Sequence, residues 1–317
     1  MTLILSISTP RASVHASDRR VTLAGSGVSP VVHSPLENKT IIFLAADAVG
    51  TIGFTGIAFV GKQPTDQWIA NTLAPQPADA PPLGTFAFGG RGLGRVKLRT
   101  VIWRLRNALA GLPRNLGKYG LTLQVAGYRI RRRRSIPFCI DIDWKGGAPT
   151  INGWMRPPRT RQQKVLFAQV GDGWPAARTA KAVADHAEAT GRRDIEALRL
   201  AAMDTIRQRA GETATVGRDL MTVMVPNPDI SREILWRFEP ADPHEAAIVG
   251  PNVSEKVQAI YSPWIITPAS VNCPTVGTSG LTVGFGGFEI KCGNDSANPD
   301  SPFRFAASHQ QRSRPPG

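Results

Sequence analysis

The order of strand-like and helix-like segments is the feature of this sequence that most limits its fold. Short runs of β-branched and apolar residues alternate with stretches in which apolar residues recur at three- and four-residue steps. Read along the chain, the order is strands, two helices, strands, two helices and strands. Two sheets packed face to face, with a helical layer on each outer side, would bury the apolar faces of all these segments. We therefore predict an α+β fold, a four-layer αββα sandwich with a C-terminal extension.

The boundaries of these segments follow from periodicity and from Gly, Pro and Asp at their ends. Strands are expected over residues 3–7, 14–22, 39–44, 51–60, 121–130, 138–143, 164–170, 215–225 and 233–238, and helices from Pro64 and over 98–112, 176–190 and 194–210. Residues 1–240 are expected to form the main domain. Residues 241–292 are expected to be an appendage of strands and loops, and the polar, Pro-rich residues 293–317 a disordered tail.

The positive charge of the chain is concentrated in one segment. The 317 residues carry a formal net charge of +14, and residues 80–140 hold thirteen Arg and Lys residues without an Asp or Glu. The densest part is the run Arg131, Arg132, Arg133 and Arg134. Such a segment can attract nucleic acid, acidic peptides or an acidic partner, and it is equally typical of a solvated basic surface. Both interpretations stay open, although no nucleic-acid-binding motif is recognisable.

Several classes of protein do not fit the composition. The three cysteines lack Cys-x-x-Cys spacing and the five histidines are scattered, so neither a disulfide framework nor a metal site is expected, and no cofactor is implied. No apolar run approaches the ~20 residues of a membrane helix, and residues 1–10 lack the features of a secretory signal. A cytoplasmic protein with no membrane partner is the expectation.

The first sixty residues carry a specific constellation of chemistry-bearing residues. Thr2 heads the first strand, Asp18 lies in the second, Lys39 opens the third, and Gly56 ends the glycine-bearing strand that follows. This pattern resembles proteasome β subunits and the related bacterial peptidases that work with an ATPase, which are N-terminal-nucleophile hydrolases. In those families an N-terminal Thr, an acidic residue of the second strand and a Lys opening the third form the active site. The spacing from Thr2 to Asp18 matches theirs, whereas Lys39 falls a few residues later.

The resemblance continues at three supporting positions. Gly171-Asp172-Gly173 is similar to the Gly-Ser-Gly that closes the strand before the paired helices in that family. Residues 212–215, Glu-Thr-Ala-Thr, are similar to the Asp-Ser-Ala-Ser segment after those helices. The resemblance therefore implies supporting roles for Asp172, Glu212 and Thr215, with Asp172 standing where the family has Ser.

The chemistry implied by the resemblance is that of a threonine-type peptidase. Once Met1 is removed, the hydroxyl of Thr2 would be the nucleophile and its own α-amine the base, since a hydroxyl needs a base to take its proton. The Lys39 ammonium would lower the pKa of that amine, and Asp18 would keep Lys39 charged and oriented. The backbone N–H of Gly56 is the candidate oxyanion donor. The resemblance further implies a homo-oligomeric ring and an ATPase unfoldase as a possible partner.

Other interpretations of the same residues remain. Taken singly, Asp18 could belong to a surface ion pair with Arg19 or Arg20, Lys39 could be a charge flanking a strand, and Gly56 could serve packing. Acidic and hydroxyl residues after strands and helices often cap loops. Two other functions are also open: an amidase that acts on a small-molecule or isopeptide amide, and a catalytically inactive scaffold that binds nucleic acid or an acidic partner through residues 91–134.

Overall fold

The computed structural model describes residues 2–23, 31–34, 38–75, 92–132, 134–154, 166–189, 195–241, 263–272, 282–285 and 287–292. The helices are α1 (Thr65–Leu73), α2 (Leu98–Ala110), the 3-10 helix η1 (Arg114–Lys118), α3 (Ala176–Ala189) and α4 (Ile195–Glu212). The strands are β1 (Leu3–Ser8), β2 (Ala12–Asp18), β3 (Val21–Leu23), β4 (Val31–Ser34), β5 (Thr40–Ala45), β6 (Ala48–Gly56), β7 (Phe59–Val60), β8 (Gln63–Pro64), β9 (Leu121–Arg131), β10 (Arg134–Trp144), β11 (Thr150–Trp154), β12 (Leu166–Gly171), β13 (Leu220–Pro226), β14 (Glu233–Glu239), β15 (Trp264–Ile266), β16 (Val271–Asn272), β17 (Thr282–Phe285) and β18 (Phe288–Cys292).

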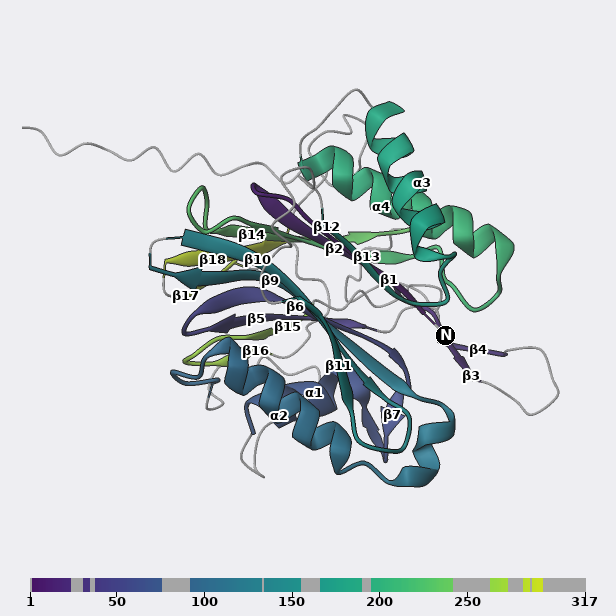
Figure 1. Ribbon diagram of the computed structural model, residues 1–317, viewed down its shortest axis with the longest axis horizontal. Coiled ribbons are helices and arrows are strands. Elements are labelled where there is room, and N and C mark those ends of the chain that lie inside the picture. Colours follow the sequence, from purple (N-terminus) through teal and green to yellow (C-terminus); the bar gives the residue numbers. More distant parts are fainter. Residues whose placement is uncertain are drawn as a thin grey trace, which may run out of the picture.

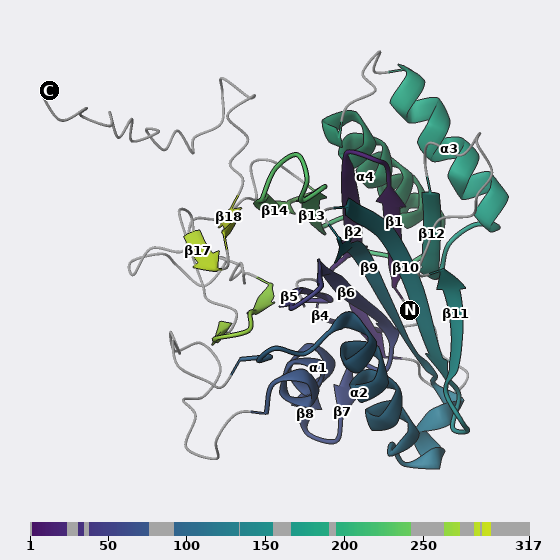
Figure 2. The same ribbon diagram turned by 60° about the vertical axis from the view of Figure 1, so that its left-hand side comes forward.

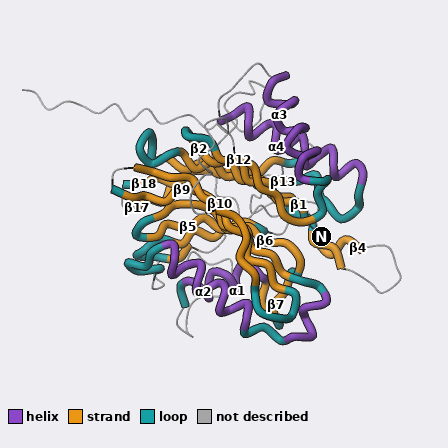
Figure 3. Tube along the Cα trace, in the orientation of Figure 1, coloured by secondary structure: helices purple, strands orange, loops and turns teal. Residues whose placement is uncertain are grey.

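Two seven-stranded sheets form the centre of the molecule. The first has the order β12-β1-β2-β13-β14-β18-β17 and the second the order β11-β10-β9-β6-β5-β15-β16. The sheets lie face to face, with α3 and α4 outside the first and α1 and α2 outside the second (Figures 1 and 3). A view turned by 60° keeps the two helical layers on opposite sides (Figure 2). The predicted four-layer αββα sandwich is confirmed.

Most predicted elements occur, and the clearest shifts in their ends lie around Asp18. The strand expected over residues 14–22 is two strands, because the Asp18 carboxylate accepts a hydrogen bond from the backbone N–H of Arg20 at 3.1 Å and turns the chain. The strand expected from residue 215 begins only at Leu220, and the preceding residues wrap around Asp18 instead. Strand β11 was not predicted. Asp194, the predicted first residue of the helix over 194–210, lies outside the described residues.

The C-terminal strands extend both sheets. Strand β15 lies parallel to β5 in the second sheet, and β18 lies parallel to β14 in the first. The side chain of Trp264 on β15 is buried, and its indole N–H donates a hydrogen bond to Asp66 on α1 at 3.1 Å. Residues 293–317, predicted to be a disordered tail, lie outside the described residues.

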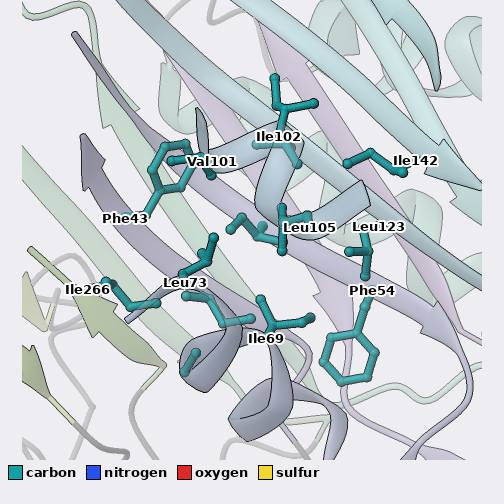
Figure 4. Close-up of a cluster of buried hydrophobic side chains, with 14 of the residues drawn as sticks. Phe43, Phe54, Ile69, Leu73, Val101, Ile102, Leu105, Leu123, Ile142 and Ile266 are labelled. Atoms are coloured by element: carbon teal, nitrogen blue, oxygen red, sulfur yellow. The ribbon is translucent and has the colours of Figure 1, made fainter. Parts of the chain in front are cut away.

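The hydrophobic core between the second sheet and its helices explains the predicted pattern of apolar residues in α2. Its buried residues are those of the predicted apolar stripe, and they pack with α1 against the outer face of the second sheet. Figure 4 shows Val101, Ile102 and Leu105 of α2 beside Phe43 and Leu123 of the sheet. The helix begins where the Asp47 carboxylate accepts the backbone N–H of Leu98 at 2.7 Å, which satisfies one of the free donors of the first turn.

The layer between the two sheets has an apolar half and a polar half. The apolar half is built around β5, β13, β14, β15 and β18 and includes Trp236 and Tyr128. The polar half is built from residues of β1, β2, β5, β9 and β10, with His15 at its centre and only 1% exposed. Burial lowers the pKa of His15 to about 3, so its imidazole is neutral at pH 7.

The buried His15 predicts a pH-dependent stability difference. Between about pH 3 and 6.5 the unfolded chain binds a proton that folded His15 does not bind, so His15 lowers stability progressively as pH falls through this window. The free-energy gap between wild type and His15→Gln is therefore expected to shrink by about 2.7 kcal/mol between pH 7.5 and 4.5. Urea unfolding at both pH values measures the gap. A gap that does not change with pH would contradict a buried, neutral His15.

Candidate active site

Lys39 and Asp18 meet Thr2 at one end of the space between the sheets. Asp18 ends β2 of the first sheet, and Lys39 immediately precedes β5 of the second. The Lys39 ammonium donates hydrogen bonds to Thr2 Oγ1 and to the backbone oxygen of Arg20, and its Nζ lies 3.3 Å from Asp18 Oδ2. These three acceptors match the three donors of an ammonium group. Lys39, 2% exposed, is therefore a buried cation placed against the Thr2 hydroxyl.

Asp18 is held by backbone donors as well as by Lys39. Its Oδ1 accepts the N–H of Leu3 at 2.8 Å, and its Oδ2 accepts the N–H groups of Arg20 at 3.1 Å and Gly217 at 3.0 Å. The side chain is fully buried, and β2 lies inside its sheet between β1 and β13. Asp18 is thus not part of a surface ion pair. Its carboxylate ties three chain segments together and supplies the negative charge that a buried Lys39 requires.

The backbone of Thr2 is clamped from two neighbouring strands. Its carbonyl oxygen accepts the N–H of Asp172 at 2.8 Å and lies 3.4 Å from the hydroxyl of Thr55 on β6. Gly171 allows this close approach: its φ is +97°, and a Cβ added there would lie 1.6 Å from the Thr2 oxygen. The position of the Thr2 hydroxyl is therefore set by backbone contacts with β12 and β6, in addition to Lys39.

Gly56, the predicted oxyanion donor, follows Thr55 at the exposed end of β6. Its φ is +107°, and a Cβ there would lie 2.2 Å from the carbonyl oxygen of Gly120. The backbone alone therefore requires glycine at this position. Gly56 directly follows Thr55, the residue whose hydroxyl contacts the Thr2 backbone.

Asp172 and Thr215 form one cluster with Arg209. The Asp172 carboxylate accepts hydrogen bonds from Thr215 Oγ1, from Thr213 Oγ1 at 3.3 Å and from Arg209 Nη2 at 3.0 Å. Desolvation is the largest single influence and raises the pKa of Asp172, but the hydrogen bonds from Thr215 and Arg209 and the Arg209 charge together bring it below its usual value. Asp172 is therefore an anion whose backbone N–H contacts Thr2 and whose charge is matched by Arg209.

Glu212 supports this cluster from the surface. Its carboxylate accepts the indole N–H of Trp174 at 2.5 Å and pairs with Arg209 at 3.1 Å and Arg178 at 3.4 Å. The hydrogen bond from Trp174 is the main reason why the pKa of Glu212 lies below its usual value. Glu212 is thus linked to Asp172 through Arg209. Among the described residues it makes no contact with Thr2.

The arginine run lies away from this cluster. Arg131 and Arg134 face each other across the ends of β9 and β10, Arg132 at the turn has a φ of 45°, and Arg133 lies outside the described residues. Gly56 pairs with Leu121 at the opposite end of β9. Ten residues of strand separate the two ends, roughly 33 Å. The arginines of the turn are therefore not part of the Thr2 site.

Several contributors to the site were not predicted. They include the hydroxyl of Thr55, the guanidinium of Arg209, the N–H of Gly217 and the carbonyl of Arg20. Only Arg209 carried a sequence signal, since it lies three residues before Glu212 on a helix, a spacing at which ion pairs form. The backbone groups of Gly217 and Arg20 have no signature in the sequence.

Two classes of feature are absent from the described part of the chain. No group of three or more His, Cys, Asp or Glu among the residues described is arranged to hold a metal ion. None of the described helices combines the length and apolar character needed to span a membrane.

Comparison with known proteins finds similarity in structure. No protein-family model and no curated protein matches the chain. It is similar to eukaryotic HslV from Trypanosoma brucei (14% identity, 70% of this chain and 98% of that chain, TM-score 0.38). It is also similar to Anbu, an ancestral beta-subunit from Yersinia bercovieri (13%, 72% and 84%, TM-score 0.44), and to Thiobacillus denitrificans BPH in complex with epoxomicin (13%, 72% and 99%, TM-score 0.37). At these identities and TM-scores the matches carry no conclusion about family or activity.

Proposed function

We propose that this chain is a threonine-type peptidase in which Thr2, exposed by removal of Met1, is the nucleophile. The observation that carries the proposal is the contact of the buried Lys39 ammonium with Thr2 Oγ1, while Lys39 is paired with the fully buried Asp18. Burying an ion pair is costly, and core packing alone does not need a hydroxyl placed against it. A nucleophile that must lose its proton benefits directly from that cation.

The reaction follows from the groups around Thr2. Thr2 Oγ1 attacks the carbonyl carbon of an amide, and its proton passes to the α-amine of the same residue. The tetrahedral intermediate carries its negative charge on the former carbonyl oxygen, which the backbone N–H of Gly56 is proposed to bind. The intermediate then collapses: the C–N bond breaks, the leaving amine takes the proton from the α-ammonium, and an ester to Thr2 remains. Water, deprotonated by the α-amine, attacks the ester. The bond from the acyl carbon to Thr2 Oγ1 breaks, Oγ1 takes the proton back from the α-ammonium, and the acid is released.

Lys39 acts in this scheme as a fixed cation and not as the base. Its three donors are directed at Thr2, Asp18 and Arg20, so the charged form is the one that fits the site. A cation beside Oγ1 stabilises the developing alkoxide and disfavours protonation of the nearby amine. Asp18 keeps Lys39 in this position, and Asp172 and Thr55 hold the Thr2 backbone.

The finer parts of the proposal concern substrate and assembly. A peptide is the proposed substrate; a small-molecule or isopeptide amide would use the same chemistry, and activity on such amides but not on peptides would favour the amidase. A cytoplasmic homo-oligomer, with an ATPase unfoldase as possible partner, is proposed on the resemblance of the sequence alone. The mass of the assembly in solution tests that part separately.

Mass spectrometry of the intact protein tests the nucleophile. After exposure to an epoxyketone, which reacts with an N-terminal Thr through its hydroxyl and amine, we expect loss of Met1 and one adduct on Thr2. Thr2→Ala should form no adduct and should not cleave any amide in a panel of peptides and small amides. Thr2→Ser, which keeps a hydroxyl, should retain measurable reactivity.

Two results would contradict the proposal. One is retention of Met1 on protein from its native source, because the α-amine would then be absent. The other is an adduct that forms equally on Thr2→Ala, because the reactive group would then be elsewhere. In that case the basic residues 91–134 become the place to look for function, through binding that weakens as salt is added.

A further inference from the structure

The polar half of the inter-sheet layer contains a continuous chain of hydrogen bonds that the proposed reaction does not use. Ser17 Oγ lies 2.9 Å from Thr40 Oγ1, which lies 3.1 Å from His15 Nε2. On the other side of the ring, His15 Nδ1 lies 3.2 Å from Ser6 Oγ. Ser6 in turn contacts Gln124 at 2.6 Å, and Gln124 contacts Asp141 at 3.2 Å. All but Asp141 are buried, with exposures of 2% or less.

The donors and acceptors of this chain can be assigned from its outer end. Desolvation raises the pKa of Asp141 to about 6, so at pH 7.5 it is mainly a carboxylate and only accepts. It therefore faces the NH₂ group of Gln124, which places the amide oxygen of Gln124 toward Ser6. The single proton of the Ser6 hydroxyl is donated to that oxygen. Ser6 Oγ can then only accept from His15 Nδ1.

The assignment continues through the ring of His15. Because neutral His15 carries its one proton on Nδ1, Nε2 is an acceptor and Thr40 must donate to it. The Thr40 proton is then used, so Ser17 donates to Thr40. Along the chain from Ser17 to Asp141, each residue thus donates a hydrogen bond to the next. No donor on this path faces a donor, and no acceptor faces an acceptor.

Three of these bonds join the two sheets beside the reactive residues. Ser17–Thr40, His15–Thr40 and Ser6–Gln124 each connect a strand of the first sheet to a strand of the second. Ser17 directly precedes Asp18 and Thr40 directly follows Lys39, so the Ser17–Thr40 bond lies one residue from each member of the ion pair. Apolar contacts are not directional, whereas hydrogen bonds fix spacing and register.

We propose that Thr40, Ser17 and His15 are positioning residues that hold Lys39 at its contact with Thr2 by fixing the distance between the two sheets at that point. This proposal rests on the proposed role of Thr2. Gly53 on β6 is part of the arrangement: a Cβ at Gly53 would lie 2.6 Å from His15 Cε1, so glycine there makes room for the imidazole.

The test compares three variants in the full chain by the rate at which an epoxyketone modifies Thr2. Thr40→Val keeps the shape but removes the hydroxyl between Ser17 and His15. A 1 Å displacement of a reacting group can cost about 10²-fold, so we expect a loss of about tenfold or more. Thr40→Ser restores the hydroxyl and should react within about twofold of wild type. Ser13→Ala is the matched control, because the hydroxyl of buried Ser13 bonds to Ser8 on the neighbouring strand of the same sheet, at 2.9 Å, and does not join the two sheets through any contact among the described residues.

The outcomes separate this inference from the proposed function. A wild-type chain whose Thr2 does not react removes the proposed function, and the positioning role falls with it. If wild type reacts and Thr40→Val reacts at the same rate, the positioning role alone is contradicted. It is also contradicted if the rate of Ser13→Ala falls as far as that of Thr40→Val. The ¹⁵N NMR shifts of His15 test the chain independently: a proton on Nδ1 is expected, and a proton on Nε2 would overturn the assignment.

Discussion

Lys39→Met is expected to lower the rate of Thr2 acylation by about 10³-fold or more, the loss seen when a member of a catalytic constellation is removed. Met has nearly the length of Lys and fits the buried path of the side chain, so the change removes the charge more than the packing. The Thr2 hydroxyl then loses its hydrogen-bond donor, and its alkoxide loses the cation in contact with it. Epoxyketone modification, followed by intact mass, measures the rate.

The same variant also loses stability, and a control must separate the two effects. Asp18, fully buried, keeps its backbone donors but loses its counter-charge, which typically costs about 3–5 kcal/mol. Arg199→Met is the matched control. Arg199 on α4 is 2% exposed and pairs with the buried Glu239 on β14. We expect a comparable fall in unfolding free energy with Thr2 reactivity kept. If Arg199→Met lost reactivity to the same extent, the effect of Lys39→Met would be one of folding and not of chemistry.

The fold was largely predictable because its signals are periodic and local. The apolar stripe of α2 matched the buried residues Val101 and Leu105, and the alternation of strands and helix pairs was enough to predict the layers. Element ends were less predictable, since they depend on distant groups. The early end of β2 is caused by the Asp18 carboxylate capturing the N–H of Arg20, and the late start of β13 by the same carboxylate binding Gly217.

The candidate site was predictable where it depends on side chains and not where it depends on backbone. Thr2, Asp18 and Lys39 were identified through the family resemblance of their types and order along the strands, and the structure brings all three together. The hydrogen-bond chain through His15 was not predicted, because Ser6, Thr40 and Gln124 are ordinary strand residues until the two sheets face each other. Their roles arise from contacts between residues up to 118 positions apart.

The contact between residue 172 and the Thr2 backbone can be kept although the residue type differs from that of the similar family. Asp172 was singled out because the resembling family has Ser there. Its N–H, which any residue other than proline would supply, is the group that contacts Thr2, while Arg209 neutralises the extra charge of the carboxylate. The departure at residue 172 is therefore matched by a cation on α4 and need not disturb the position of Thr2.

Gly171→Ala is the second change with a large expected effect. At φ of +97°, an L-residue is strained by about 1–2 kcal/mol. Its Cβ would lie 1.6 Å from the carbonyl oxygen of Thr2, so one of the two backbones must move. Because Thr2 lies just outside the paired residues of β1, whereas Gly171 is paired with Leu3 within the sheet, we expect Thr2 to move and the Asp172–Thr2 hydrogen bond to break. A shift near 1 Å corresponds to about a 10²-fold loss in the rate of acylation.

Gly173→Ala provides the matched comparison for this prediction. The atoms nearest to a Cβ at Gly173 would be the side-chain ends of Gln169 and Leu3, both at 3.0 Å, and these can give way. We expect the acylation rate of Gly173→Ala to stay within a few-fold of wild type while Gly171→Ala loses most reactivity. Thermal unfolding of both variants shows whether they are folded at the assay temperature. If folded Gly171→Ala reacted at the wild-type rate, the reactivity of Thr2 would not depend on its clamp to β12, and Lys39 and Thr55 alone would be sufficient to position the nucleophile.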